Sequence, residues 1–216
     1  IFQENVPISS YEQLFEEIDL VCQGKADILW PGKAKWIAKS SGTTNNKSKT
    51  IRVTREALKK CHYKGGEDVV ALYLDQNPYS KLFSGKTLSV GGSFSDKKNP
   101  RDLFCGDLSA ILINNLPLWA RIFRSPRLST ALLDEWEKKV EVIARSTIKK
   151  NVVALAGVPS WTLVVLNKVL DITGKDNILD VSPNLESFIH GGVSFAPYQT
   201  QFEKIGRVAY RKTDIK

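Results

Sequence analysis

Apolar positions along the chain switch between extended and helical spacing, which predicts strands alternating with helices. The clearest helical stretch is 129–146, where apolar side chains share one face and Glu and Lys occupy the other. Short apolar runs predict strands at 34–38, 51–53, 88–90, 152–156 and 186–190. This alternation indicates an α/β domain, and no repeat or linker divides the chain.

Helix boundaries are expected at capping residues and glycines. Ser10-Tyr11-Glu12-Gln13 has the form of a capping box that opens a helix ending near Gly24. Apolar residues in this helix recur at a spacing that predicts a buried stripe: Leu14, Phe15, Ile18 and Val21.

Two later helices have weaker boundary signals. Thr54 is expected to cap a helix that reaches about Tyr63 and ends at Gly65-Gly66, while the next run, 69–74, fits a helix or a strand. Ser160 is expected to cap a helix that reaches about residue 172, with Gly174 just beyond its end.

Composition is that of a globular protein. The 216 residues are 42% hydrophobic and 25% charged, which excludes a disordered chain and is enough for one sizeable domain. No apolar run approaches the roughly 20 residues of a membrane span, so we expect no membrane partner. The cysteines Cys22, Cys61 and Cys105 show no metal-ligand spacing with the two histidines. We therefore expect reduced thiols, a cytoplasmic location and no metal held by these residues.

The net charge of +8 raises the question of nucleic acid. The basic residues are mostly scattered, with local groups at 33–60 and 204–216, and aromatic side chains are not interleaved with them. A single-strand binding surface needs such aromatic side chains for base stacking. We therefore expect no nucleic-acid partner.

The segment 39–49 is the strongest candidate for chemistry. It reads Lys-Ser-Ser-Gly-Thr-Thr-Asn-Asn-Lys-Ser-Lys and lies between two predicted strands. Glycine allows close backbone approach, hydroxyl and N–H groups donate to phosphate oxygens, and lysine adds positive charge. The spacing differs from that of a P-loop. A polar surface turn is the alternative interpretation of the segment taken alone.

The flanking residues narrow the interpretation. The hydroxyl-rich segment resembles the first ATP-binding motif of the adenylate-forming superfamily. Nine blocks together resemble, in order, the auxin-responsive Gretchen Hagen family of acyl-acid amido synthetases: 29–32, 40–44, 47–49, 61–66, 106–112, 134–137, 156–161, 183–186 and 190–195. The resemblance covers the chain to about Phe202. It implies the α/β large N-terminal domain of an adenylate-forming enzyme.

The resemblance also implies ligands and their sites. It implies ATP and Mg²⁺, although the sequence identifies no metal ligand and no catalytic residue. The implied phosphate-binding residues are Ser40, Ser41, Gly42, Thr43, Thr44, Lys47 and Lys49. The implied adenine-binding residues are Gly191, Gly192 and Val193, and the implied acyl pocket comprises Gly157, Val158, Pro159 and Trp161. By itself a Gly-Gly pair is more often a turn, and a lone Trp is more often part of a core.

The implied function is an ATP-dependent ligase. It would activate a carboxylic acid as its acyl-adenylate and conjugate the acyl group to an amine such as an amino acid. The family's later acidic ATP motif, its ribose-binding aspartate and its small C-terminal domain are not recognisable after Phe202. We therefore expect residues 1–216 to be a single partial N-terminal adenylation domain, inactive alone. A naturally short, catalytically degenerate ATP-binding protein of the same fold is the alternative.

One position departs from the family pattern beside the hydroxyl-rich segment. Arg52 stands where the family usually has proline. Because proline stiffens a strand, we expect arginine to leave this segment freer and to add charge.

Overall fold

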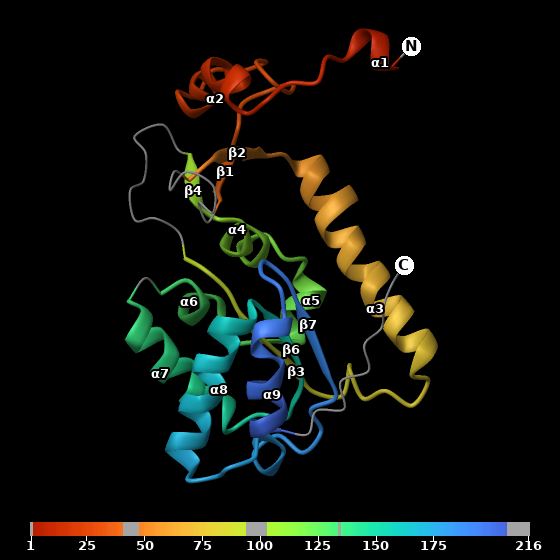
Figure 1. The fold of residues 1–216 in the computed structure, drawn as a ribbon, viewed down its shortest axis with the longest axis vertical. Coiled ribbons are helices and arrows are strands. Elements are labelled where there is room, and N and C mark those ends of the chain that lie inside the picture. The colour runs from red at the N-terminus through yellow and green to blue at the C-terminus, as the bar shows by residue number, and fades with distance from the viewer. Residues whose placement is uncertain (1, 41–47, 94–102, 134, 207–216) are drawn as a thin grey trace.

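The computed structural model of the protein describes residues 2–40, 48–93, 103–133 and 135–206 (Figure 1). Two sheets form its framework. The three-stranded sheet has the order β2 (Thr50–Val53), β1 (Trp36–Lys39), β4 (Phe104–Asp107). The four-stranded sheet has the order β5 (Arg124–Ser125), β3 (Lys86–Val90), β6 (Val152–Gly157), β7 (Ser187–His190). Its neighbouring strands are all parallel, whereas β1 runs antiparallel to β2 and parallel to β4.

Helices connect and cover the sheets, which confirms the α/β prediction. In the described residues the α-helices are α1 (Phe2–Asn5), α2 (Phe15–Cys22), α3 (Lys64–Gln76), α4 (Leu108–Asn114), α5 (Leu118–Ile122), α6 (Leu128–Ala131), α7 (Trp136–Thr147), α8 (Pro159–Thr173) and α9 (Gln199–Ile205). Shorter turns of helix are η1 (Glu12–Leu14), η3 (Ile178–Asp180) and η4 (Ala196–Tyr198), and η2 (Ala57–Tyr63) is a π-helix.

The main core lies between the four-stranded sheet and the α7–α8 layer. Strand β6 is central, and Val152 to Leu155 are at most 2% exposed. Burial on both faces suits a parallel strand that helices cover on each side. Helices α7 and α8 pack over one face through residues such as Ile143 and Leu166, while α3 reaches Val153 on the other face. Figure 1 shows these layers, with α3 running along the opposite side of the molecule.

The predicted capping box is confirmed. The backbone N–H of Gln13 donates to Ser10 Oγ at 3.3 Å, and the N–H of Ser10 donates to Gln13 Oε1 at 2.7 Å. The predicted stripe is largely wrong, because only Val21 is buried and Phe15 is 58% exposed. Helix α2 reaches the three-stranded sheet through its last turn, where Val21 packs in a small cluster.

The predicted end of the helix after Thr54 is also wrong. Thr54 Oγ1 accepts the N–H of Ala57 at 3.0 Å, so the cap is confirmed. The chain then passes through η2 directly into α3, and the run 69–74 is helical. Gly65 and Gly66 are exposed, a Cβ atom on either would meet open space, and neither has positive φ. Each glycine costs about 1 kcal/mol within a helix, which is too little to interrupt thirteen hydrogen-bonded residues.

Two further boundaries differ from the predictions. The amphipathic stretch 129–146 is divided into α6 and α7, and Lys139 on its predicted polar face is 2% exposed. Ser160 does not cap α8, because Val158 is the N-cap residue and Pro159 is the first helical residue. Proline suits this position, where its missing N–H has no helical partner. Gly174 ends α8 with φ +64°, as predicted.

Candidate functional site

Glycine-containing turns follow three neighbouring parallel strands at one edge of the four-stranded sheet. Val90 of β3 pairs with Gly157 of β6, which in turn pairs with His190 of β7. The strands therefore end at the same level, and the carboxyl edge of a parallel sheet is where α/β proteins usually bind ligands. The implied acyl and adenine segments, 157–161 and 191–193, both begin at this edge.

The acyl and adenine segments are in contact. Gly157 has φ +150°, and a Cβ atom on it would overlap the carbonyl oxygen of Val90. Gly192 has φ +84°, and a Cβ atom there would lie 3.2 Å from Cγ2 of Val158. Only glycine combines these backbone angles with this close approach. The structure thus brings Gly192 against Val158, although they are far apart in sequence.

The remaining residues of these two segments differ in exposure. Gly191, Gly192 and Val193 are exposed, whereas Pro159 is buried. The Trp161 ring is partly buried and lies 5.8 Å from the Trp136 ring, centroid to centroid. Trp161 is thus at the rim of the core beside α7, and its role as a pocket wall stays a prediction.

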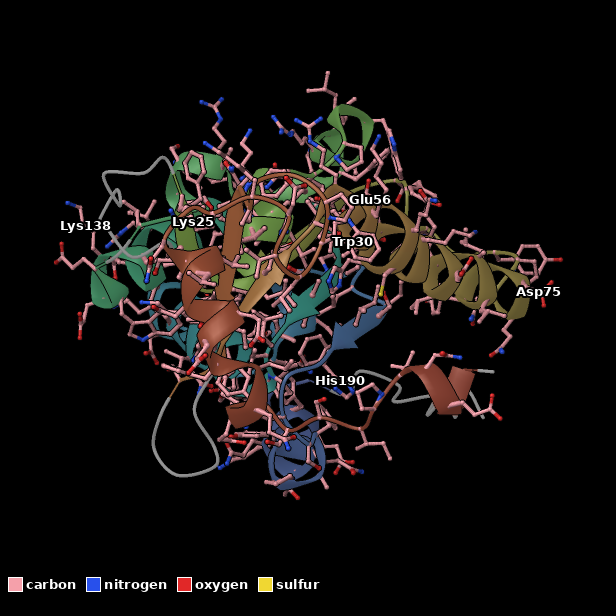
Figure 2. The ribbon with its side chains drawn as sticks, turned by 90° about the horizontal axis from the view of Figure 1, so that it is seen from above. Lys25, Trp30, Glu56, Asp75, Lys138 and His190 are labelled. Atoms are coloured by element: carbon pink, nitrogen blue, oxygen red, sulfur yellow. The ribbon has the colours of Figure 1, made fainter. Side chains whose placement is uncertain are left out.

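His190 directly precedes the implied adenine segment. It is the last residue of β7 (Figure 2). Its ring stacks on the buried Phe195 ring, with the two ring centroids 4.6 Å apart. Burial lowers the pKa of His190 below its usual 6.5. A neutral, flat ring therefore flanks the Gly191-Gly192 turn at neutral pH.

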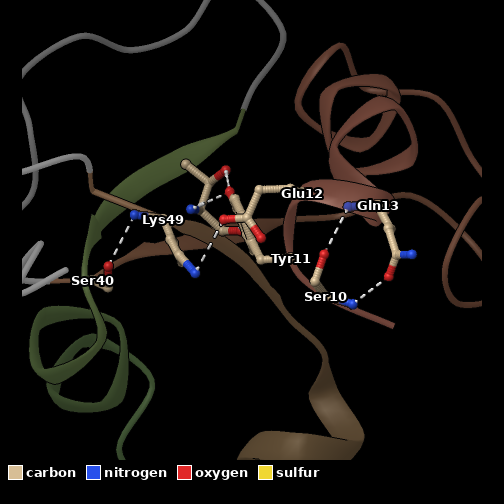
Figure 3. Close-up of polar contacts among 7 residues, drawn as sticks. Ser10, Tyr11, Glu12, Gln13, Ser40 and Lys49 are labelled. Atoms are coloured by element: carbon tan, nitrogen blue, oxygen red, sulfur yellow. Dashed lines mark hydrogen bonds and ion pairs between the residues drawn. The ribbon is translucent and has the colours of Figure 1, made fainter. Parts of the chain in front are cut away.

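The hydroxyl-rich segment is described only at its two ends. Ser41, Gly42, Thr43, Thr44 and Lys47 lie outside the described residues. The N–H of Ser40 donates to the carbonyl of Lys49, and the N–H of Lys49 donates to Ser40 Oγ, each at 2.9 Å. These two bonds close the base of the segment, between the end of β1 and the start of β2 (Figure 3).

Polar contacts tie this base to the N-terminal segment (Figure 3). Lys49 Nζ lies 3.6 Å from Glu12 Oε1 and 4.9 Å from the centre of the Tyr11 ring. The hydroxyl oxygen of Tyr11 accepts the N–H of Thr50 at 2.9 Å. A backbone hydrogen bond and the Lys49 ammonium lower the pKa of Glu12. The charge of Lys49 therefore already has a carboxylate neighbour, but the pair is exposed and weak.

Arg52 stabilises the neighbouring turn, contrary to the expectation of a freer strand. Its guanidinium donates to the carbonyls of Trp30, Pro31 and Gly32 at 2.7, 3.1 and 3.1 Å. The positively charged Arg52 side chain therefore holds the turn at 30–32 through its carbonyl oxygens. Arginine replaces the stiffness of proline with side-chain hydrogen bonds.

The two sheets meet beside the base of the hydroxyl-rich segment. Lys39, at the end of β1, pairs with Asp107, at the end of β4. The Asp107 carboxylate packs against Gly92, where a Cβ atom would overlap it. The N–H of Gly92 donates to Ser109 Oγ at 2.9 Å, and Lys139 Nζ donates to the carbonyls of the same turn.

Sequence reasoning assigned no role to Asp107, Ser109 or Lys139. The first two lie in the block 106–112, which carried the resemblance, so that block was an available signal. Lys139 offered no such signal, because it stands in a Lys- and Glu-rich helix face that is typical of a solvated surface.

The described residues offer no ready set of metal ligands. Across residues 2–40, 48–93, 103–133 and 135–206, no three His, Cys, Asp or Glu side chains lie close enough together to hold an ion. In these same ranges, no helix has the length and apolar character needed to cross a membrane.

Residues 1–208 match the family model described as the GH3 family N-terminal domain. The chain belongs to the GH3 family. This confirms the family predicted from the ordered motifs. A search of curated proteins found no match.

Solved GH3 structures share the fold of this GH3 chain. A structure titled AtGH3.15 acyl acid amido synthetase in complex with 2,4-DB matches with a TM-score of 0.72 and 16% identity, over 94% of this chain and 44% of that one. Another, titled GH3.15 acyl acid amido synthetase, matches with a TM-score of 0.58 and 20% identity, over 79% of this chain and 30% of that one. The GH3 chain thus has the mixed α/β fold of part of an adenylate-forming enzyme, and it spans less than half the length of either relative.

Proposed function

We propose that this GH3 chain provides the nucleotide- and acid-binding part of an acyl acid amido synthetase. The observation that carries the proposal is the contact between Gly192 and Val158 at the carboxyl edge of the four-stranded sheet. It would place the adenine segment beside the acyl segment. An enzyme that joins an acid to a nucleotide needs both ligands held side by side.

The proposed reaction has two steps. A carboxylate oxygen attacks the α-phosphorus of ATP, an O–P bond forms, and the bond to the β-phosphate breaks to release pyrophosphate. The amine nitrogen then attacks the acyl carbon, the acyl–phosphate bond breaks to release AMP, and the nitrogen loses a proton. The protein's task in the first step is to hold the acid in line and to neutralise phosphate charge.

The hydroxyl-rich segment is proposed to hold the phosphates. GH3 membership implies the use of ATP. Ser40 and Lys49 close the base of the segment at the end of β1. Ser41, Gly42, Thr43, Thr44 and Lys47 are the proposed donors, and Lys49 is a weaker candidate because Glu12 already lies beside it. No step is assigned to Mg²⁺.

A second candidate function is ATP binding without adenylation. Adenylate-forming chemistry would then depend on groups that a longer relative provides. Both candidates require the hydroxyl-rich segment to bind ATP, so they differ only in whether bound ATP reacts with an acid.

The test combines binding and exchange measurements on the purified chain. ATP binding is measured by calorimetry, and ATP–pyrophosphate exchange is measured with Mg²⁺ and a panel of small carboxylic acids. Exchange that depends on one acid supports the ligase, whereas ATP binding with no exchange supports the second candidate. The double variant Ser41→Ala/Thr43→Ala is expected to weaken ATP binding, because two donors are lost.

A matched control keeps this test specific. Ser9→Ala/Thr200→Ala removes two exposed hydroxyls outside the segment and is expected to leave ATP affinity unchanged. Equal ATP affinity in the wild type and Ser41→Ala/Thr43→Ala would contradict the phosphate role. A wild-type chain that binds no ATP would overturn both candidates.

A further inference from the structure

A buried lysine in the core binds the Gly91–Gly92 turn, which follows β3. Lys139 lies on α7 and is 2% exposed. Its Nζ donates to the carbonyl oxygens of Gly91 and Gly92 at 2.8 and 3.1 Å. Burying an ammonium group is costly unless its donors are bonded, so these contacts help to stabilise Lys139 in the core.

Other groups hold the same turn from the side of the three-stranded sheet. The N–H of Gly92 donates to Ser109 Oγ at 2.9 Å, and the N–H of Asp107 donates to the carbonyl of Ser93 at 3.3 Å. The Asp107 carboxylate packs so closely on Gly92 that no side chain fits there. The turn therefore connects the end of β3 to the end of β4.

This connection extends to the base of the hydroxyl-rich segment. Asp107 of β4 lies opposite Lys39 of β1 in the register of the parallel strands. Ser40 follows Lys39 in the chain and is the first residue of that base. A movement of the Gly91–Gly92 turn would thus be transmitted through Asp107 to Ser40. The adenine segment follows β7, which is separated from β3 by β6, so it would be affected less.

We propose that Lys139 is a positioning residue for the nucleotide phosphates. It fixes the Gly91–Gly92 turn against Asp107 and so sets the position of Ser40, at the base of the hydroxyl-rich segment. This inference rests on the proposed ATP-binding function. It assigns a role at the site to a residue whose side chain lies in the core.

The adjacent lysine provides a matched control. Lys138 is exposed, and Figure 2 shows it at the periphery of the molecule. Lys138→Met and Lys139→Met make the same chemical change one residue apart on the same helix. A second control, Ile143→Ala, creates a cavity in the same core without removing a contact to the turn.

The first experiment compares ATP with adenosine by calorimetry. Lys139→Met is expected to lower ATP affinity roughly tenfold, the effect of losing a charge-assisted contact, and to leave adenosine affinity within about twofold. Lys138→Met is expected to change neither. Equal losses of ATP and adenosine affinity in Lys139→Met and Ile143→Ala would overturn the inference, because a general loss of stability would explain them.

The second experiment measures how well the Gly91–Gly92 turn is held in the absence of a nucleotide. Amide hydrogen exchange of Gly92, followed by NMR, is expected to accelerate in Lys139→Met and not in Lys138→Met. The amide of Glu186, which donates to the carbonyl of Val153 at 2.9 Å, serves as an internal reference. If Lys139→Met does not fold, Lys139→Gln keeps a donor without the charge and is measured in the same way.

The two experiments separate the failure of each proposal. If the wild-type chain binds no ATP, the proposed function is contradicted. If the Gly92 amide nevertheless exchanges faster in Lys139→Met, the positioning of the turn by Lys139 is still supported. Wild-type ATP binding with unchanged affinity and unchanged Gly92 exchange in the variant overturns the inference alone. Restored ATP affinity in Lys139→Arg, which keeps the charge, supports it.

Discussion

The two sheets of this GH3 chain hold their loops by different means. In the four-stranded sheet, the turns at Gly157 and Gly192 are fixed by close backbone approach above a buried parallel strand. In the three-stranded sheet, side chains at the surface fix the base of the hydroxyl-rich segment through Tyr11 and Lys49, and the neighbouring turn through Arg52. A substitution in the first region should therefore disturb the fold, and one in the second should mainly disturb the local loop.

The largest effect is expected at Gly157. Gly157→Ala forces a side chain into positive φ and into the carbonyl of Val90, which should lower the free energy of unfolding by about 3 kcal/mol. Gly174→Ala is the control, because it has φ +64° but open space, and about 1 kcal/mol is expected. Urea denaturation measures both. Equal losses would mean that the close approach to Val90 contributes nothing.

The next effect is expected at Tyr11. Tyr11→Phe removes the acceptor of the Thr50 N–H and a contact to Thr50 Oγ1, so about 1.5 kcal/mol of unfolding free energy should be lost. Tyr79→Phe removes a hydroxyl from a side chain that is 95% exposed and should leave stability unchanged. A Tyr11→Phe variant as stable as the wild type would show that surface contacts do not hold the base of the segment.

A smaller effect is expected at Arg52. Arg52→Met removes the three hydrogen bonds to the carbonyls of 30–32 and should cost about 1 kcal/mol of unfolding free energy. Arg55→Met, at an exposed position nearby, is the matched control. If Arg52→Met instead stabilises the chain, the family's proline would be better replaced by an apolar residue than by arginine.

The smallest effect is the pH dependence that His190 contributes. Its pKa is lowered in the folded state, so the unfolded state takes up a proton more readily below the usual value of 6.5. The contribution of His190 to stability is complete above pH 6.5 and falls as the pH drops below it. Denaturation between about pH 5 and pH 7.5 should show a shallower dependence for His190→Phe, which keeps an aromatic ring on Phe195. Identical pH slopes of stability in the wild type and His190→Phe would show that His190 does not contribute.

Local signals in the sequence predicted much of the fold. The Ser10–Gln13 capping box, the Thr54 cap and the glycine after α8 involve groups within a few residues of one another, and all three were confirmed. The strand β6 was visible as a continuous apolar run. The predicted helix end at Gly65 failed because a glycine signals a helix end only where the backbone needs positive φ.

The candidate site was predicted in its segments but not in its connections. Motifs indicated the segments around Ser40, Gly157 and Gly191, because each keeps a recognisable local composition. The break between α6 and α7 and the burial of Lys139 were not visible. A lysine among Glu and Lys residues has the pattern of a surface, and only the packed structure shows its contact with a distant turn.

The sequence by itself determined the family, the α/β class, the hydroxyl-rich segment and the approximate positions of β1, β2, β3, β6 and β7, because these depend on side-chain order over short stretches. It did not show β4 or β5. Only the tertiary structure decided that Gly192 meets Val158 and that Asp107 meets Gly92. It also decided that Lys139 bonds carbonyls 47 and 48 residues away. Such contacts depend on how strands stack side by side, and burial then assigns each side chain a partner that local spacing does not encode.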